Sequence, residues 1–197
     1  MSRSRTTTRR PRLATVAFVV LGLLLGLLGP LVASSRASAT VCEAPWGSLP
    51  KTSSSHTTKP LTGVRTGQQL CYDRLVLDIG RSGTGAVGYD VRYVSVVGAE
   101  GSGAPLPVRG DADIKVTVNA PAYNVSTGAP TYTPSNPNEL SNVSGYRTFR
   151  QLRWAGSFEG QSTIALGVRA RLPMRVFVLS DTDGSRRLVV DVAHLWY

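Results

Sequence analysis

The sequence is short of the residues on which most catalytic and metal sites depend. Its 197 residues include two cysteines and two histidines. The cysteines are not in C-x-x-C spacing, so the sequence does not support a structural zinc site. A hydrolase needs a nucleophile with its base, a tuned carboxylate pair or a metal. In the part expected to fold, the only histidine is His194, at the end of a predicted strand. We therefore expect a protein that is not an enzyme and that binds no cofactor or metal.

A clustered basic face is also missing once the N-terminus is set apart. The formal net charge is +10, but six of the 22 cationic residues precede residue 40 and all 12 acidic residues follow Cys42. The remainder therefore carries a net charge of +4. This charge is too small to predict nucleic-acid binding, which needs a concentrated basic surface. It is compatible with weak attraction to an anionic envelope polymer or lipid surface.

The long apolar run of the chain lies near the N-terminus and predicts export. Residues 1–12 hold five arginines and no acidic residue, and residues 13–32 are almost wholly apolar. Residues 37–39 (Ala-Ser-Ala) match the small-residue cleavage signal. We predict a signal peptide over residues 1–39, cleaved after Ala39. The protein should then be secreted or associated with the cell envelope.

Two alternatives remain for this leader. About 20 apolar residues could just span a bilayer, so an uncleaved leader would serve as a membrane anchor and would be the protein's only membrane contact. A lipid-modified cysteine is the second alternative, because Cys42 follows the apolar run closely. Such cysteines normally follow a small residue, whereas Val41 precedes this one.

Residues 40–60 are predicted to form a flexible tether. Residues 51–60 are rich in serine and threonine, with too little apolar surface to offset the entropy of ordering. Trp46 is the exception and is expected to dock near Cys71. In an exported domain, Cys42 and Cys71 should form a disulfide, which would contribute about 3–4 kcal/mol on the chain-entropy estimate. Two free thiols are the alternative.

After the leader, short alternating stretches replace any helical pattern. They predict eight or nine strands in a small all-β, two-sheet β-sandwich that occupies residues 61–197. Residues 80–88 are expected to be a hairpin connection, since a phosphate loop would need Gly-Lys-Ser/Thr. Residues 181–185 contain Asp-Gly and are expected to be a hairpin turn rather than a calcium loop. The predicted strands lie at residues 61–67, 70–79, 89–97, 105–108, 112–119, 147–154, 163–168, 174–179 and 187–192.

Two further features stand out along the domain. Residues 74–79 and 187–192 share Arg-Leu-Val, an aliphatic residue, an aspartate and another aliphatic residue, which suggests two related halves around one core. Residues 120–145 have no periodicity and contain four prolines. Loops of this length are usually functional or disordered.

Six segments of the predicted domain are distinctive, at residues 72–78, 88–94, 101–103, 110–114, 154–161 and 187–194. Together they resemble the AMIN-like domains of exported bacterial proteins, and the resemblance extends across residues 61–194. The resemblance implies a small β-sandwich related to the AMIN modules of envelope amidases and secretion pores. Those modules are non-catalytic and localise their partners, in several cases by binding peptidoglycan.

We therefore expect an exported module that binds peptidoglycan or another wall polymer. Arginine and aromatic groups suit carboxylates and sugar rings, so the candidate ligand-binding residues are Arg74, Tyr89, Arg92, Arg153, Trp154 and Arg187. Each of them has an alternative structural role, as an ion pair across a sheet or as a core side chain. The second hypothesis is a regulatory domain that docks on another exported protein through residues 120–145. A small apolar ligand between the sheets is a third possibility.

Overall fold

The computed structural model describes Cys42 and residues 45–196. The predicted signal peptide and its cleavage site lie outside these residues. The described part consists of eleven strands joined by turns and loops. In that part, no helix has the length and apolar character needed to cross a membrane.

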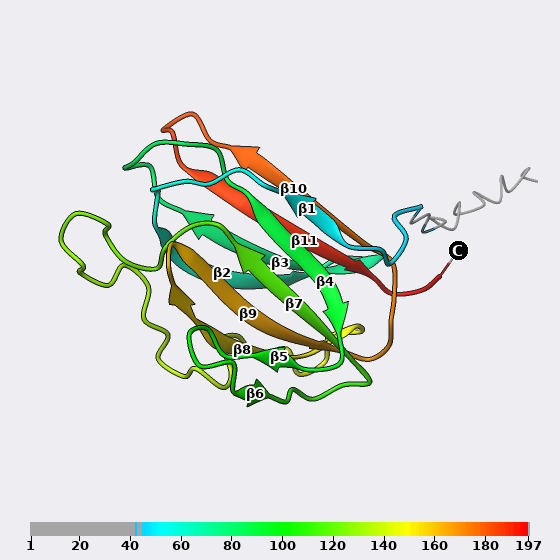
Figure 1. The fold of residues 1–197 in the computed structure, drawn as a ribbon. Helices are drawn as coiled ribbons and strands as arrows, with labels where there is room; N and C mark the ends of the chain where they lie inside the picture. The colour runs from blue at the N-terminus through cyan, green and yellow to red at the C-terminus, as the bar shows by residue number, and fades with distance from the viewer. Residues whose placement is uncertain (1–41, 43–44, 197) are drawn as a thin grey trace, which may run out of the picture. The chain divides into compact units, whose positions relative to one another are not determined.

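Two antiparallel sheets confirm the predicted all-β class (Figure 1). One sheet has five strands in the order β1 (Lys51–Ser53), β4 (Tyr89–Val94), β7 (Ala112–Val118), β9 (Gln161–Val168) and β8 (Phe149–Phe158). The other has four in the order β10 (Met174–Ser180), β11 (Arg186–Ala193), β3 (Tyr72–Ile79) and β2 (Leu61–Gln68). A short hairpin forms from β5 (Val97–Gly98) and β6 (Pro105–Leu106).

The core follows from the two-residue alternation of the strands. Successive side chains of a strand point to opposite faces, so every second residue can face the other sheet. Twelve inward aliphatic side chains of β3, β7, β9 and β11 are each no more than 1% exposed. Burial of each such side chain contributes about 1.5–3 kcal/mol. These side chains are Leu75, Leu77, Ile79, Ile114, Val116, Val118, Ile164, Leu166, Val168, Leu188, Val190 and Val192.

The repeated motif proves to be a single pairing within one sheet. Its two copies form β3 and β11, which are antiparallel neighbours at the centre of the four-stranded sheet. The register places Arg74 opposite Asp191 and Asp78 opposite Arg187. An Arg-Leu-Val-x-Asp sequence is therefore self-complementary in charge when it pairs antiparallel with its own copy. This arrangement differs from the expected two halves around the core.

The connection over residues 80–88 is not the predicted hairpin. It leaves β3 in one sheet and enters β4 in the other. A hairpin is impossible because β3 already pairs with β2 and β11, while β4 pairs with β1 and β7. The connection is instead held to the N-terminal segment, where Thr57 forms a bridge with Gly85. The predicted hairpin between β10 and β11 is confirmed.

The described part of the predicted tether packs against the sandwich. Strand β1 extends the five-stranded sheet by pairing with β4, and the backbone amide of Thr57 donates to Asn119 O at 3.1 Å. Backbone pairing at a sheet edge orders this segment despite its polar side chains, which a prediction from side-chain composition could not detect. The disulfide between Cys42 and Cys71 is confirmed, with a Cα–Cα distance of 5.3 Å.

Trp46 docks beside this disulfide, as predicted. Its ring packs edge-to-face on Tyr72, the residue after Cys71, with the centroids 5.7 Å apart. The amide of Met174 also donates to Gly47 O at 2.8 Å. His56 is exposed, in agreement with the composition around it.

Candidate ligand-binding pocket

The two predicted arginines of the four-stranded sheet are already engaged by carboxylates. Arg74 Nε donates to Asp191 Oδ1 at 2.6 Å, and Arg175 Nε donates to Asp191 Oδ2 at 2.8 Å. Asp191 is fully buried, and its hydrogen bond raises the pKa of Arg74. Arg187 Nη2 donates to Asp181 Oδ1 at 2.5 Å. These contacts match the structural role that was the alternative for both arginines.

Aromatic rings enclose the cations around Asp191. The guanidinium of Arg175 lies 4.4 Å from the centroid of the Trp46 ring. Arg74 and Arg175 both lie over the rings of Tyr72 and Phe177, at 5.2–5.6 Å. Cations placed over aromatic faces in this way gain roughly 0.5–1 kcal/mol each at exposed sites.

The other four predicted residues belong to the five-stranded sheet and divide between its two faces. Arg92 pairs with Asp90 at 2.7 Å, while Arg153 donates to Asn138 Oδ1 at 3.1 Å and to Pro107 O at 2.8 Å. Tyr89 and Trp154 are half-buried and pack against the core. The six residues therefore do not converge on one surface, because strand alternation and sheet membership separate them.

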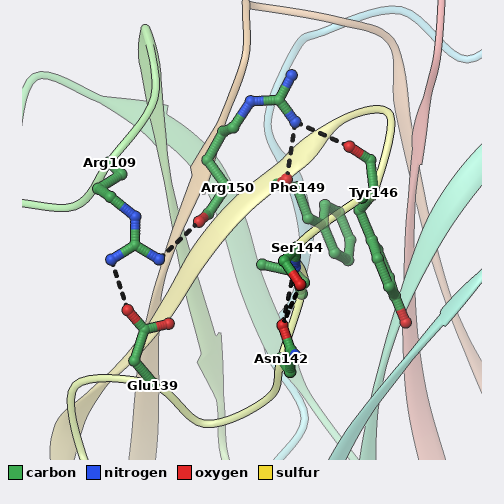
Figure 2. A pocket seen from close by; sticks show the side chains of 9 residues that line it. Arg109, Glu139, Asn142, Ser144, Tyr146, Phe149 and Arg150 are labelled. Carbon is green, nitrogen blue, oxygen red and sulfur yellow. Dashed lines mark hydrogen bonds and ion pairs between the residues drawn. The ribbon is translucent and has the colours of Figure 1, made fainter.

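A pocket of about 630 Å³ lies where the irregular segment after Ala120 meets β8 (Figure 2). Its volume falls within the range of about 300–1,000 Å³ that is usual for small-molecule sites. The lining combines two cations, one carboxylate, two aromatic rings and several small polar groups. The residues are Arg109, Glu139, Asn142, Val143, Ser144, Gly145, Tyr146, Phe149 and Arg150.

Backbone hydrogen bonds fix one wall of the pocket to the edge of the five-stranded sheet. The Leu140 amide donates to Leu152 O at 3.0 Å, and the Trp154 amide donates to Pro137 O at 2.7 Å. The two bonds satisfy backbone groups of β8 that would otherwise be unpaired. The long loop predicted from the sequence therefore forms an ordered wall here.

The same wall also reaches the four-stranded sheet. Thr66 Oγ1 on β2 lies 2.6 Å from Ser141 Oγ and 3.1 Å from the hydroxyl of Tyr146. Between these anchors, Asn142 Oδ1 accepts hydrogen bonds from the amide and hydroxyl of Ser144, at 3.0 and 2.7 Å. This local turn presents the amide group of Asn142 at the pocket.

The charges of the pocket are only partly balanced. Arg109 Nη1 donates to Glu139 Oε1 at 2.5 Å, which raises the pKa of Arg109. Arg150 Nη1 donates instead to the carbonyl oxygens of Tyr146 and Phe149, at 3.0 and 2.9 Å (Figure 2). Among the described residues, Arg150 forms no ion pair with a carboxylate. The pocket therefore keeps one net positive charge and suits an anionic oxygen group.

The histidine that the sequence places in the folded part does not lie at this pocket. Over residues 45–196 and Cys42, no group of three or more His, Cys, Asp or Glu side chains could hold a metal ion. His194 is buried elsewhere, with Nε2 lying 3.0 Å from Asp73 Oδ1 and Nδ1 lying 3.2 Å from Leu70 O. Its place fits a structural role.

The individual pocket residues were not among the sequence-derived candidates, although two sequence signals lie beside it. One is the aperiodic stretch of residues 120–145, and the other is the arginine-rich stretch over residues 147–154 that follows directly. The pocket forms at their junction. The contribution of Arg109 from the β6–β7 connection depends on tertiary structure and has no local signal.

A family model described as the AMIN-like domain matches residues 59–194. A search of curated proteins and a search of solved structures each returned no match. Domains of this family are generally non-catalytic binding modules and occur in exported envelope proteins. Since the match covers well over half of the 197 residues, the chain belongs to the AMIN-like domain family.

Proposed function

We propose that this protein is an exported, non-catalytic module that binds peptidoglycan or another wall polymer through the pocket at the junction of residues 137–146 with β8. The observation that carries the proposal is the cation of Arg150, which lines a pocket of about 630 Å³ and forms no ion pair within the described chain. Family membership supports an envelope-associated module and leaves the ligand to be identified.

The chemistry of the pocket suits a polymer with both sugar and acidic groups. A guanidinium binds carboxylate or phosphate oxygens through charge-assisted hydrogen bonds, which are about twice as strong as neutral ones. The Asn142 amide and the Ser144 hydroxyl can exchange hydrogen bonds with sugar hydroxyl or peptide amide groups. The Tyr146 ring stacks on Phe149 with centroids 6.1 Å apart, so one ring supports the other.

Of the six residues suggested by the sequence, Arg153 is the one we retain for this surface. Its Nε donates to Asn138, the neighbour of the pocket residue Glu139. Arg153 also has no carboxylate partner among the described residues, so it would add positive charge beside the pocket.

Retention on purified peptidoglycan at low salt tests the proposal. We expect retention of the native protein and a loss of at least about tenfold in affinity for Arg150→Ala, equivalent to about 1.4 kcal/mol. Arg81→Ala removes an equal charge from the exposed part of the 80–88 connection and should bind normally. Thermal unfolding of each variant checks that the fold is intact. No retention of the native protein, or equal retention of Arg150→Ala, would reject the proposal.

A second candidate function is docking on another exported protein through residues 120–145. Residues 124–130 are all exposed, and the side chain of Val125 is 52% exposed. Two backbone hydrogen bonds join residues of this segment to one another. Replacing residues 124–130 by a short glycine linker leaves the pocket residues in place. Loss of partner capture with intact polymer binding would favour this second function.

A further inference from the structure

Three of the four edges of the two main sheets are protected against pairing with another strand. The β8 edge carries two register shifts and the two backbone contacts to residues 137–140. The β2 edge carries one register shift, and its Leu61 O accepts a hydrogen bond from Thr131 Oγ1 at 2.8 Å. The β1 edge is only three residues long. Bulges, covering loops and short strands are the usual devices that prevent edge-to-edge association.

The fourth edge, β10, has none of these devices along most of its length. Its seven residues pair with β11 in continuous register, and they include no proline. Figure 1 shows β10 at the margin of the four-stranded sheet. Because the Met174 amide donates to Gly47, its N–H points away from β11. Alternation then directs the N–H and C=O groups of Val176, Val178 and Ser180 the same way.

These three outward positions have no hydrogen-bond partner in the part of the chain that the structure describes. The side chains beside them are apolar and only half-buried, from Val176 to Leu179. An uncovered, regular and apolar edge of this kind is a template for another strand.

We propose that β10 pairs antiparallel with β10 of a second copy, about a two-fold axis at Val178. The pairing joins two four-stranded sheets into one sheet of eight strands. Val178 then lies opposite itself, and Val176 lies opposite Ser180 of the second copy. All of these positions have outward N–H and C=O groups, so the pairing forms about six backbone hydrogen bonds.

The contact of Met174 at one end of β10 and the end of the strand at Ser180 favour this register. A two-fold axis at Val176 would require the outward N–H of Met174, which Gly47 O already occupies. An axis at Ser180 would place Val176 opposite Gly184, beyond the end of the strand. The register at Val178 uses the whole uncovered part of β10.

Side chains are complementary in the same register. Phe177 lies opposite Leu179 of the second copy, and this apolar pair occurs twice by symmetry and stabilises neighbouring strands. Arg175 lies near Asp181 of the second copy, just beyond the strand end, so no like charges meet there, and both groups keep their own partners Asp191 and Arg187. In this two-fold interface the β10 edge of each copy is paired with that of the other, so no open edge remains and association stops at the dimer. The inference is independent of the proposed ligand.

Sedimentation of the purified full-chain protein at rising concentration tests the interface. We expect a concentration-dependent dimer for the native protein. Val178→Pro removes an N–H that points away from β11, a change that edge strands tolerate, and should weaken dimerisation at least about tenfold. Val178→Lys places a charge at the edge and should act in the same way. Val125→Lys, on the exposed loop, is the matched control.

Cross-linking tests the register. Val178→Cys should be joined to its counterpart by a short bis-maleimide, whereas Ser180→Cys should not, since its counterpart lies four residues away, roughly 13 Å along the strand. A strictly monomeric native protein overturns the proposal. So does a dimer that survives both Val178 substitutions with melting temperatures unchanged, or one that cross-links through Ser180→Cys alone.

Discussion

Arg74 and Asp191 lie directly opposite one another on neighbouring strands, and Arg74 Nε donates to Asp191 Oδ1 at 2.6 Å. They are the arginine of the first copy of the repeated motif and the aspartate of the second. The other cross-strand positions, Asp78 and Arg187, use different partners: Asp78 pairs with Arg65 and Arg187 pairs with Asp181. One end of the repeat therefore forms a cluster around a buried carboxylate, while the other forms two partly exposed pairs.

This difference predicts unequal costs for the two aspartates of the repeat. Asp191→Ala leaves Arg74 and Arg175 without the fully buried carboxylate that they share, and should lower the free energy of unfolding by about 3–5 kcal/mol. Asp78→Ala is the matched control, since its partner Arg65 has a 55% exposed side chain. Its cost should be about 0–1 kcal/mol. Urea unfolding of both variants measures the difference, and equal losses would contradict the assignment.

The sequence carries much of the strand pattern because burial and alternation act locally. The aliphatic residues at every second position of β3, β7, β9 and β11 predict both the strands and their inward faces. The disulfide and the Asp-Gly turn before β11 could also be predicted from the sequence. The disulfide follows from the pair of cysteines in an exported domain, and the turn follows from its local sequence. The family resemblance is confirmed over nearly the same residues.

Features that depend on which strands become neighbours could not be predicted from the sequence. The sequence placed Arg74 and Arg153 among ligand-binding candidates together, yet they lie on different sheets. Strand β1 was not predicted, because its residues become ordered through backbone pairing with β4 and not through their own side chains. The pocket depends on Arg109 and Arg150, which are about 40 residues apart and meet through tertiary packing, with Arg109 Nη2 donating to Arg150 O.

Asp73 holds the ends of three strands together, and its removal should be costly. Its Oδ2 accepts from the amides of Thr148 and Phe149 at 2.6 and 2.9 Å, and its Oδ1 lies 3.0 Å from His194 Nε2. All of these groups are buried, so Asp73→Ala leaves several polar groups without partners. We expect a loss of roughly 3 kcal/mol in the free energy of unfolding.

Asp73→Asn is the informative comparison for this cluster. Its amide oxygen can still accept from the two backbone amides, and its NH₂ group can donate to a neutral His194. Chemical denaturation should therefore show a clearly smaller loss for Asp73→Asn than for Asp73→Ala. If the two substitutions cost the same, the charge of Asp73 matters more than its hydrogen bonds.

Removal of the disulfide should lower stability while leaving the sheets formed. Cys42 and Cys71 are 29 residues apart, and closing a loop of that length contributes about 3–4 kcal/mol on the chain-entropy estimate. A Cys42→Ala, Cys71→Ala double variant should melt at a lower temperature and keep its β-sheet circular dichroism spectrum at 20 °C, a temperature well below typical domain midpoints of about 45–65 °C. A reductant should destabilise the native protein and leave the variant unchanged. A response of the variant to reductant would point to another cause.

Tyr93 should make stability fall at alkaline pH. Burial raises the pKa of Tyr93, whose hydroxyl donates to Leu172 O and accepts from the Leu172 amide, both at 2.8 Å. The neutral phenol is therefore favoured in the folded state. Its contribution is complete below the ordinary tyrosine pKa of about 10 and is lost as the pH rises through the raised pKa of the folded protein.

Tyr93→Phe separates this effect from general alkaline unfolding. The variant loses both hydrogen bonds and should be less stable at neutral pH by roughly 1–3 kcal/mol, because the Leu172 backbone groups are left without their partner. Its stability should then depend less steeply on pH above about 10. Burial also raises the pKa of Tyr132, so Tyr132→Phe serves as the control for a second buried phenol that lacks the Leu172 contacts. Urea midpoints measured from neutral to alkaline pH, together with phenolate absorbance, give both quantities. Parallel pH profiles for the native protein and Tyr93→Phe would show that ionisation of Tyr93 is not coupled to unfolding.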